Sequence, residues 1–244
     1  MTKRVAVLLF GVGIYCVFLI TVGYGVGFVG NLNVWKSIDS GSPGPFSLAI
    51  AVDLLLIAVF GLQHSVMARP SFKARWLNVI PPSLERSVYV LCASLSLLLL
   101  FWQWQPLPRD LWHPAPGPVH SLLLALFWFG WLDVVYSTFL VNHFDLFGLR
   151  HVFLYFRDIE YTPVPFKQSL LYRYVRHPLM LAFLVAFWAT PRMTVGHFVF
   201  AMGMTVVIVI GTILEERDLL SLHGSAYARY RKSVSMFIPV PRRK

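Results

Sequence analysis

Long apolar runs separated by short polar segments dominate the chain. They cover residues 5–29, 46–67, 84–104 and 119–141, and a further run at 194–214 follows a shorter one at 178–190. A helix needs about 20 apolar residues to cross a hydrocarbon core of about 30 Å. Because lipid offers backbone groups no hydrogen-bond partner, each crossing run must be helical. The pattern predicts an all-α integral membrane protein with five to six transmembrane helices.

The run at 178–190 covers only about 20 Å as a helix, and Thr190-Pro191-Arg192 separates it from the next run. These two runs predict a C-terminal hairpin with one short and one long arm, and whether the short arm fully crosses stays open. After the hairpin, a cytoplasmic helix is expected, interrupted near Gly224. We therefore divide a single membrane domain, 1–244, into a four-helix bundle at 1–141, a cytoplasmic loop at 142–177, and the hairpin with its C-terminal helix at 178–244.

The distribution of Lys and Arg predicts the orientation. If the N-terminus is cytoplasmic and every run crosses, 18 of the 21 basic residues lie on the inner side, and only Lys36, Arg109 and Arg192 lie outside. Cytoplasmic loops carry such an excess of positive charge. Both termini are therefore expected in the cytoplasm.

Composition agrees with a membrane protein, since 57% of the residues are hydrophobic and 13% are charged. The net charge of +10 is explained by topology and anionic lipid, so no nucleic-acid partner is expected. Cys16 and Cys92 lie inside apolar runs and are interpreted as small hydrophobic residues. No metal is expected, because no Cys/His cluster or H-E-x-x-H motif occurs. The G-x-G-x-x-G at 25–30 ends an apolar run and joins no strand to a helix, which excludes a dinucleotide fold.

Ionisable groups within or beside membrane spans are costly, so each is a functional candidate. The predicted topology brings a set of polar residues to the cytoplasmic side: His64, Asn142, His143, Asp145, His177, Glu215 and Glu216. For His64 and His143 an alternative stays open, because a histidine can also serve as an interhelical hydrogen-bonding group.

The stretch "YRYVRHPLM" at 172–180 opens the short arm. Pro178 suits a first helical position, and the amides of the following turn can receive an anion such as a carboxylate. The long arm returns the pair Glu215-Glu216 to the same side. A ligand that suits both flanks has a carboxylate, a cation, hydroxyls and an aromatic ring. S-adenosylmethionine has all four, and the residues permit this ligand without requiring it.

The pattern "YRYVRHPLM…LEERDLL…HGSAYARYRKSVSMFIP" resembles the isoprenylcysteine carboxyl methyltransferase-like superfamily of membrane methyltransferases. The resemblance covers about 171–239 and implies S-adenosylmethionine binding at the cytoplasmic face of a bacterial-type inner membrane. By position, it implies the cofactor-binding residues Tyr174, Arg176, His177, Pro178, Glu215, Glu216, Tyr227 and Tyr230. Met180 and Ala182 depart from the family's usual Tyr and Gly, so no direct role is assigned to them.

Further stretches, among them "GLQHSVMARPSFKARW" and "STFLVNHFDLFGLRHVFLYFR", are similar to the bacterial methanethiol S-methyltransferases. That likeness implies methylation of methanethiol to dimethyl sulfide. Since the thiolate is the nucleophile, a proton acceptor is needed, and the candidates are His143, His64 and Asp145. The residues Asn142, Phe144, Phe147 and Tyr172 are expected to enclose the small thiol.

Three alternatives stay open: methylation of a prenylated cysteine carboxylate or another lipid, a non-catalytic accessory protein of the same fold, and a transporter. The transporter is disfavoured because the polar groups gather at one face and do not line a path through the midplane. Beyond the thiol and the lipid bilayer, no obligatory protein partner is inferred.

Overall fold

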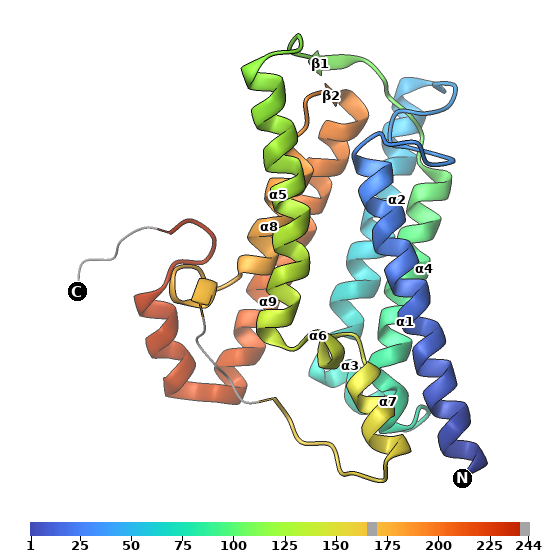
Figure 1. The fold of residues 1–244 in the computed structure, drawn as a ribbon, viewed down its shortest axis with the longest axis vertical. Helices are drawn as coiled ribbons and strands as arrows, with labels where there is room; N and C mark the ends of the chain where they lie inside the picture. Colours follow the sequence, from blue (N-terminus) through green and yellow to red (C-terminus); the bar gives the residue numbers. More distant parts are fainter. Residues whose placement is uncertain (165–169, 240–244) are drawn as a thin grey trace. The chain divides into compact units, whose positions relative to one another are not determined.

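The computed structural model describes residues 1–164 and 170–239 and is almost entirely helical (Figure 1). Parts of two predicted segments, residues 165–169 of the cytoplasmic loop and 240–244 of the C-terminal segment, lie outside this range. Five of the described helices are long and apolar enough to cross a membrane: α1 (Thr2–Val29), α2 (Phe46–Met67), α4 (Pro82–Gln103), α5 (Pro118–Val141) and α9 (Val195–Ser233). Only 22–33% of their most apolar windows is buried inside the protein, so lipid must solvate the rest. The prediction of an all-α integral membrane protein is confirmed.

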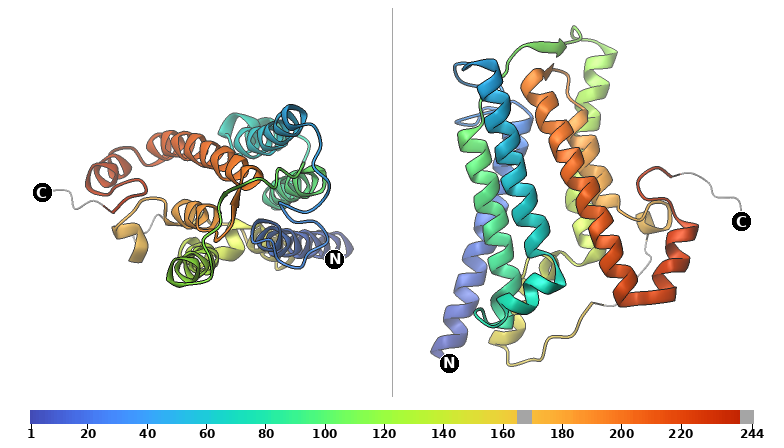
Figure 2. Two further views of the ribbon diagram at one scale, coloured as in Figure 1. Left: turned by 90° about the horizontal axis from the view of Figure 1, so that it is seen from above. Right: turned by 180° about the vertical axis from the view of Figure 1, so that it is seen from behind.

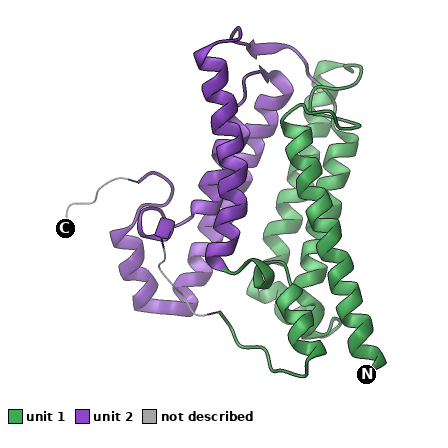
Figure 3. Cartoon of the chain, viewed as in Figure 1, with its two compact units in different colours: residues 1–106, 142–165 green, residues 107–141, 166–244 purple. Residues whose placement is uncertain are grey.

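The sixth apolar helix, α8 (Pro178–Trp188), has 11 residues and spans about 16 Å. It is the predicted short arm, and alone it cannot cross a core of about 30 Å. Pro178 occupies its first turn, as the sequence predicts. The chain forms two compact units, residues 1–106 with 142–165 (unit 1) and residues 107–141 with 166–244 (unit 2), shown in Figure 3.

Unit 1 is built on α1, α2 and α4, with α1 and α2 both packed against α4. Three short helices complete it: α3 (Pro70–Trp76), α6 (His143–Leu146) and α7 (Leu149–Phe156). The helix α7 packs on α1, where a Cβ added to Gly11 would lie 2.6 Å from the side chain of Val152. Glycine at this position therefore permits the close approach of the two helices.

Unit 2 contains α5, α8 and α9, together with a single turn of 3₁₀ helix, η1 (Leu170–Arg173). The helices α5 and α8 approach very closely at Gly130, because a Cβ there would lie 2.7 Å from the backbone nitrogen of Ala186. Figure 2 shows α9 running beside α8 before its terminal part, coloured red, turns and runs back. Gly224 makes this break, with φ 52° and ψ −126°, which confirms the predicted interruption.

A small sheet that the sequence did not predict ties α8 and α9 to the segment before α5. The strands β1 (Asp110–Trp112) and β2 (Met193–Thr194) pair antiparallel, with Asp110 opposite Thr194. Arg192 Nε donates to Asp110 Oδ1 at 2.8 Å, and the Trp112 indole donates to the carbonyl of Thr190. These contacts fix the turn of the predicted hairpin.

Candidate functional site

The Arg-His-Pro segment of unit 2 is buried and paired with a later part of the chain. Val175 forms a parallel bridge with Ser235, Arg176 N donates to the carbonyl of Ser235 at 2.8 Å, and His177 N donates to that of Met236. His177 then occupies the N-cap position of α8, without a side-chain hydrogen bond to the helix. The reversal of the chain at Gly224 returns residues 235–236 to the Arg-His-Pro segment.

Arg176 is the centre of the site. Its guanidinium approaches Glu216 Oε1 through both Nε and Nη2, each at 2.7 Å, and both side chains are about 95% buried or more. Its Nη1 donates to the carbonyls of Arg231 and Val234. Hydrogen bonds between two charged groups are about twice as strong as those between neutral groups. The predicted approach of the cationic and anionic flanks is thus present. Arg176 uses its donors to hold Glu216 and the end of α9 in place.

The two neighbouring acids, Glu215 and Glu216, have different surroundings. Glu216 is buried and also contacts His177 Nε2 at 3.2 Å and Arg231 Nε at 3.3 Å. The side chain of Glu215 is 48% exposed and reaches His177 Nδ1 only at 3.8 Å. As expected for neighbours on a helix, the two carboxylates point in different directions. The imidazole of His177 lies between them, and Glu215 is the one available to a ligand.

Three tyrosines border this cluster. The rings of Tyr227 and Tyr230, both nearly fully buried, meet edge to face with centroids 5.9 Å apart. The Tyr230 hydroxyl donates to the carbonyl of Tyr172 at 2.6 Å, which anchors η1 to α9. Burial and the nearby Glu215 charge raise the pKa of Tyr172 above its ordinary value. Tyr174, by contrast, is 69% exposed.

Two members of this cluster were missed by the sequence reasoning, namely Arg231 and the carbonyl of Val234. Arg231 contacts Glu216 and is half exposed. Its position next to Tyr230, a residue that the resemblance assigns to the cofactor, could have indicated that Arg231 belongs to the site. Backbone carbonyls such as that of Val234 leave no signal in a sequence.

In unit 1, His143 is buried against aromatic residues. Its Nε2 lies 2.6 Å from the hydroxyl of Tyr15, and its ring meets the edges of Phe144 and Phe147 at centroid distances of 5.4 and 4.9 Å. Burial lowers the pKa of His143 below its ordinary value. The imidazole is therefore neutral at pH 7 and able to accept a proton. Tyr15 was not foreseen, because it comes from a distant part of the sequence.

Asp145 and Asn142 have contacts that stabilise the local fold. Asp145 accepts hydrogen bonds from Arg150 Nη1 at 2.8 Å and from the Tyr161 hydroxyl at 3.2 Å, and His151 lies 3.7 Å away. Arg150 and Tyr161 thus take both carboxylate oxygens. Asn142 Oδ1 accepts from the backbone amide of Asp145 and caps α6.

His64 contacts a different set of residues. Its ring lies 3.0 Å from the hydroxyl of Tyr89 on α4 and packs against Phe60 of its own helix. This geometry fits the interhelical hydrogen-bonding alternative. The predicted thiol-enclosing residues Asn142, Phe144 and Phe147 belong to unit 1 with His143, whereas Tyr172 belongs to unit 2.

Among the described residues, no group of three or more His, Cys, Asp and Glu side chains is placed to hold a metal ion. The arrangement in unit 2 instead offers a half-exposed carboxylate, a half-exposed guanidinium and aromatic rings around a rigid ionic centre. Such a set suits an organic ligand that carries both charges.

Comparison with known proteins gives consistent matches. A family model described as NnrU protein matches residues 54–236. The methanethiol S-methyltransferase of Mycobacterium tuberculosis is 50% identical over 241 residues, 99% of each chain, and that of Crocosphaera subtropica is 49% identical over 97% of this chain and 93% of its own. Nurim of Sus scrofa is 31% identical over 72% of this chain and 70% of its own. No solved structure matches the chain.

The relatives named as methyltransferases support a methyltransferase enzyme and agree with the resemblance drawn from the sequence. Their matches run through the complete Arg-His-Pro to aromatic-Ile-Pro region, which folds as one cluster in unit 2. The chain belongs to the NnrU protein family, and to the same family as the relatives named methanethiol S-methyltransferase that it matches over nearly its full length.

Proposed function

We propose that this protein is an S-adenosylmethionine-dependent thiol S-methyltransferase that converts methanethiol to dimethyl sulfide. The observation that carries the proposal is the buried cluster of Arg176, His177 and Glu216, which holds Glu215 and Arg231 partly exposed beside it. The names of the relatives that match along nearly the whole chain support the reaction class and the substrate. The excess of Lys and Arg on one side supports cytoplasmic termini and a cytoplasmic active site.

The chemistry of the exposed groups fits this cofactor. Glu215 suits the ammonium or sulfonium, and Arg231 suits the carboxylate, since an arginine fork matches carboxylate geometry. The aromatic faces of Tyr172 and Tyr174 suit a cation or an adenine ring. Arg176 has its donors on Glu216 and two carbonyls, so its part is to fix the site.

S-adenosylmethionine, when bound, would supply an electrophilic methyl group. The chain must then take the proton of the thiol, because the thiolate is the nucleophile, and must hold the sulfur in line with the methyl group. Of the three candidates, His143 combines a neutral imidazole with a position fixed by Tyr15. The carboxylate of Asp145 is held by Arg150 and Tyr161, which leaves it less suited to this role.

The decisive experiment incubates the purified protein with methyl-labelled S-adenosylmethionine and methanethiol and measures labelled dimethyl sulfide in the headspace. Formation of the product is the expected result. Label transferred to a prenylated cysteine analogue and not to methanethiol would replace the proposal with a lipid methyltransferase. Transfer to neither substrate would favour an accessory role.

Replacing Glu215 with glutamine should raise the Kd for S-adenosylmethionine at least about tenfold. A hydrogen bond to a charged group contributes about 1.5–3 kcal/mol, and each 1.4 kcal/mol is a factor of ten. Isothermal titration calorimetry measures the change directly. Glu160→Gln, the same substitution at an exposed position of unit 1, should leave the Kd unchanged. An unaltered Kd in Glu215→Gln would remove this carboxylate from the cofactor site.

His143→Ala should lower kcat about 10²- to 10⁴-fold, the usual contribution of a general base, while the Kd for S-adenosylmethionine changes little. In the wild type, burial lowers the pKa of His143, so the acid limb of the kcat profile should lie below pH 6.5 and activity should be lost as the pH falls through it. His113→Ala, at an exposed histidine of unit 2, is the control. Equal losses of kcat and cofactor affinity in His143→Ala would contradict a role in proton transfer.

A further inference from the structure

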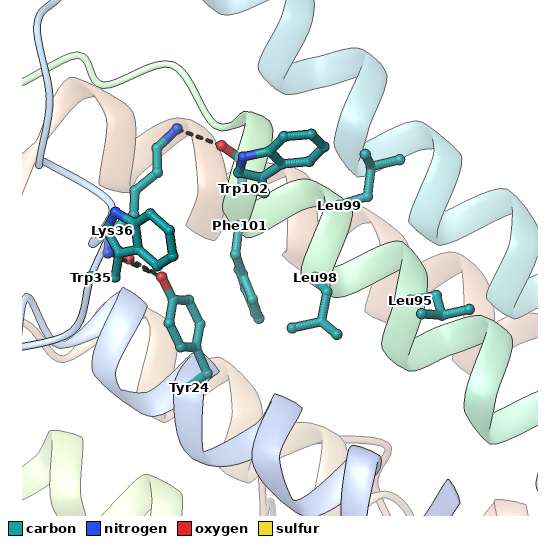
Figure 4. Close-up of a pocket in the computed structure, with 8 residues that line it drawn as sticks. All are labelled: Tyr24, Trp35, Lys36, Leu95, Leu98, Leu99, Phe101 and Trp102. Atoms are coloured by element: carbon teal, nitrogen blue, oxygen red, sulfur yellow. Dashed lines mark hydrogen bonds between the residues drawn. The ribbon is translucent and has the colours of Figure 1, made fainter.

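A half-open groove of about 650 Å³ runs along unit 1, and none of its lining residues is assigned to methyl transfer (Figure 4). Its volume is within the range of about 300–1,000 Å³ that is typical of sites for small organic ligands. Its walls come from the C-terminal halves of α1 and α4 and from the segment that follows α1. It therefore lies at the ends of two membrane-spanning helices.

The wall on α4 is an apolar stripe. Leu95, Leu98, Leu99 and Trp102 lie three or four residues apart in neighbouring turns, and Figure 4 shows them along the same stretch of α4. Leu95 and Leu99 are 54% and 40% exposed. Apolar side chains exposed along a membrane-spanning helix are suited to contact with hydrocarbon. The elongated stripe matches a linear acyl chain.

The end of the groove is polar and rigidly built. The hydroxyl of Tyr24 donates to the carbonyl of Lys36 at 2.9 Å and accepts from the amide of Lys36 at 3.0 Å. The ammonium of Lys36 donates to the carbonyl of Trp102 at 2.6 Å, in the last turn of α4. This bond satisfies a carbonyl that has no partner within the helix and offsets the partial negative charge of its C-terminus.

Lys36 retains capacity for an anion. An ammonium has three donors, and within the described residues, 1–164 and 170–239, this one makes a hydrogen bond to the Trp102 carbonyl. The indoles of Trp35 and Trp102, which are 99% and 70% exposed, stand beside it. Tryptophan and lysine together are typical of the level at which lipid headgroups lie.

We propose that the groove binds a glycerophospholipid, with one acyl chain along the leucine stripe and the phosphate at Lys36. The leucine stripe and the ammonium of Lys36 suit a ligand that has both a long apolar chain and an anionic group. The proposal is independent of the methyl-transfer function.

Native mass spectrometry of the full chain in detergent tests the proposal with two probes that share the same chains. Dioleoylphosphatidylglycerol has the phosphate, and dioleoylglycerol lacks it. The wild type should bind the phospholipid at least about fivefold more tightly, since one lysine near an anionic lipid contributes about 1 kcal/mol. Lys36→Gln should abolish this preference, and Lys36→Arg should keep it. Circular dichroism checks that each variant retains its helices.

Three further variants separate the contribution of the acyl chain from that of the headgroup. Leu98→Trp fills the groove and should lower the binding of both lipids, whereas Leu122→Trp, at an exposed leucine of α5, should not. Arg109→Gln, an exposed cation of unit 2, should leave the phosphate preference intact. Equal binding of the two lipids by the wild type, or a preference that persists in Lys36→Gln, would overturn the proposal.

Discussion

Glu216→Ala is expected to destabilise the protein by about 3–5 kcal/mol, the usual cost of removing one partner of a buried ion pair. The substitution leaves Arg176, which is 95% buried, without the carboxylate that accepts its Nε and Nη2 hydrogens. It also deprives His177 and Arg231 of their shared partner. The change should appear as a large fall in the thermal unfolding midpoint, followed in detergent by circular dichroism, and as a loss of cofactor binding.

Glu215→Ala is the matched control. The neighbouring carboxylate is half exposed and only 3.8 Å from His177, and exposed ion pairs contribute about 0–1 kcal/mol. Its unfolding midpoint should therefore remain near that of the wild type, although cofactor affinity falls. If both alanine variants unfolded at the same temperature, Glu216 would have no special part in holding unit 2 together.

Gly130→Ala is expected to lower stability by about 1–3 kcal/mol or more, as overpacking of a core does. The new Cβ would lie 2.7 Å from the nitrogen and 2.9 Å from the Cα of Ala186. Both atoms are backbone, so no side-chain rotation can relieve the clash, and α5 and α8 must move apart. Thermal unfolding in detergent measures the loss. The rate of methyl transfer should fall as well, because the Arg-His-Pro segment leads directly into α8.

The same substitution at Gly211 supplies the comparison. An added Cβ on this α9 residue meets no atom within 4 Å, leaving aside the helix's own nearby backbone. Alanine favours helix over glycine by up to about 1 kcal/mol, so Gly211→Ala should be neutral or slightly stabilising. A Gly130→Ala protein as stable as Gly211→Ala would show that α5 and α8 tolerate a wider separation.

The fold was largely predictable because membranes restrict the choices. An apolar run of some 20 residues must be a helix, so the predicted and observed bounds of α2 agree, and those of α5 differ by one residue. The short elements were not predictable. The β1–β2 pairing depends on Asp110 meeting Thr194 across a long stretch of chain, and α6 is a single turn capped by Asn142. Contacts of this kind are decided by tertiary structure and leave no periodic pattern.

In the candidate site, too, some contacts could be predicted from the sequence and others could not. The approach of Arg176 to Glu216 followed from the hairpin and from the quoted motif, and the structure has it. The sequence did not reveal that Arg176 would also bond the carbonyl of Val234, or that Tyr15 would meet His143. Hydrogen bonds to backbone atoms and between residues far apart in the chain require a fold before they can be named. The ligand roles of these residues stay predictions.

The parallel bridge between Val175 and Ser235 has a consequence for biosynthesis. A ribosome makes Arg176 and His177 before it makes Glu216 and residues 234–236, which stabilise them. Until those residues are made, Arg176 lacks the carboxylate and the carbonyl that it bonds in the folded protein. The site therefore cannot be completed before the chain has been synthesised to residue 236, so its assembly is a late step of folding.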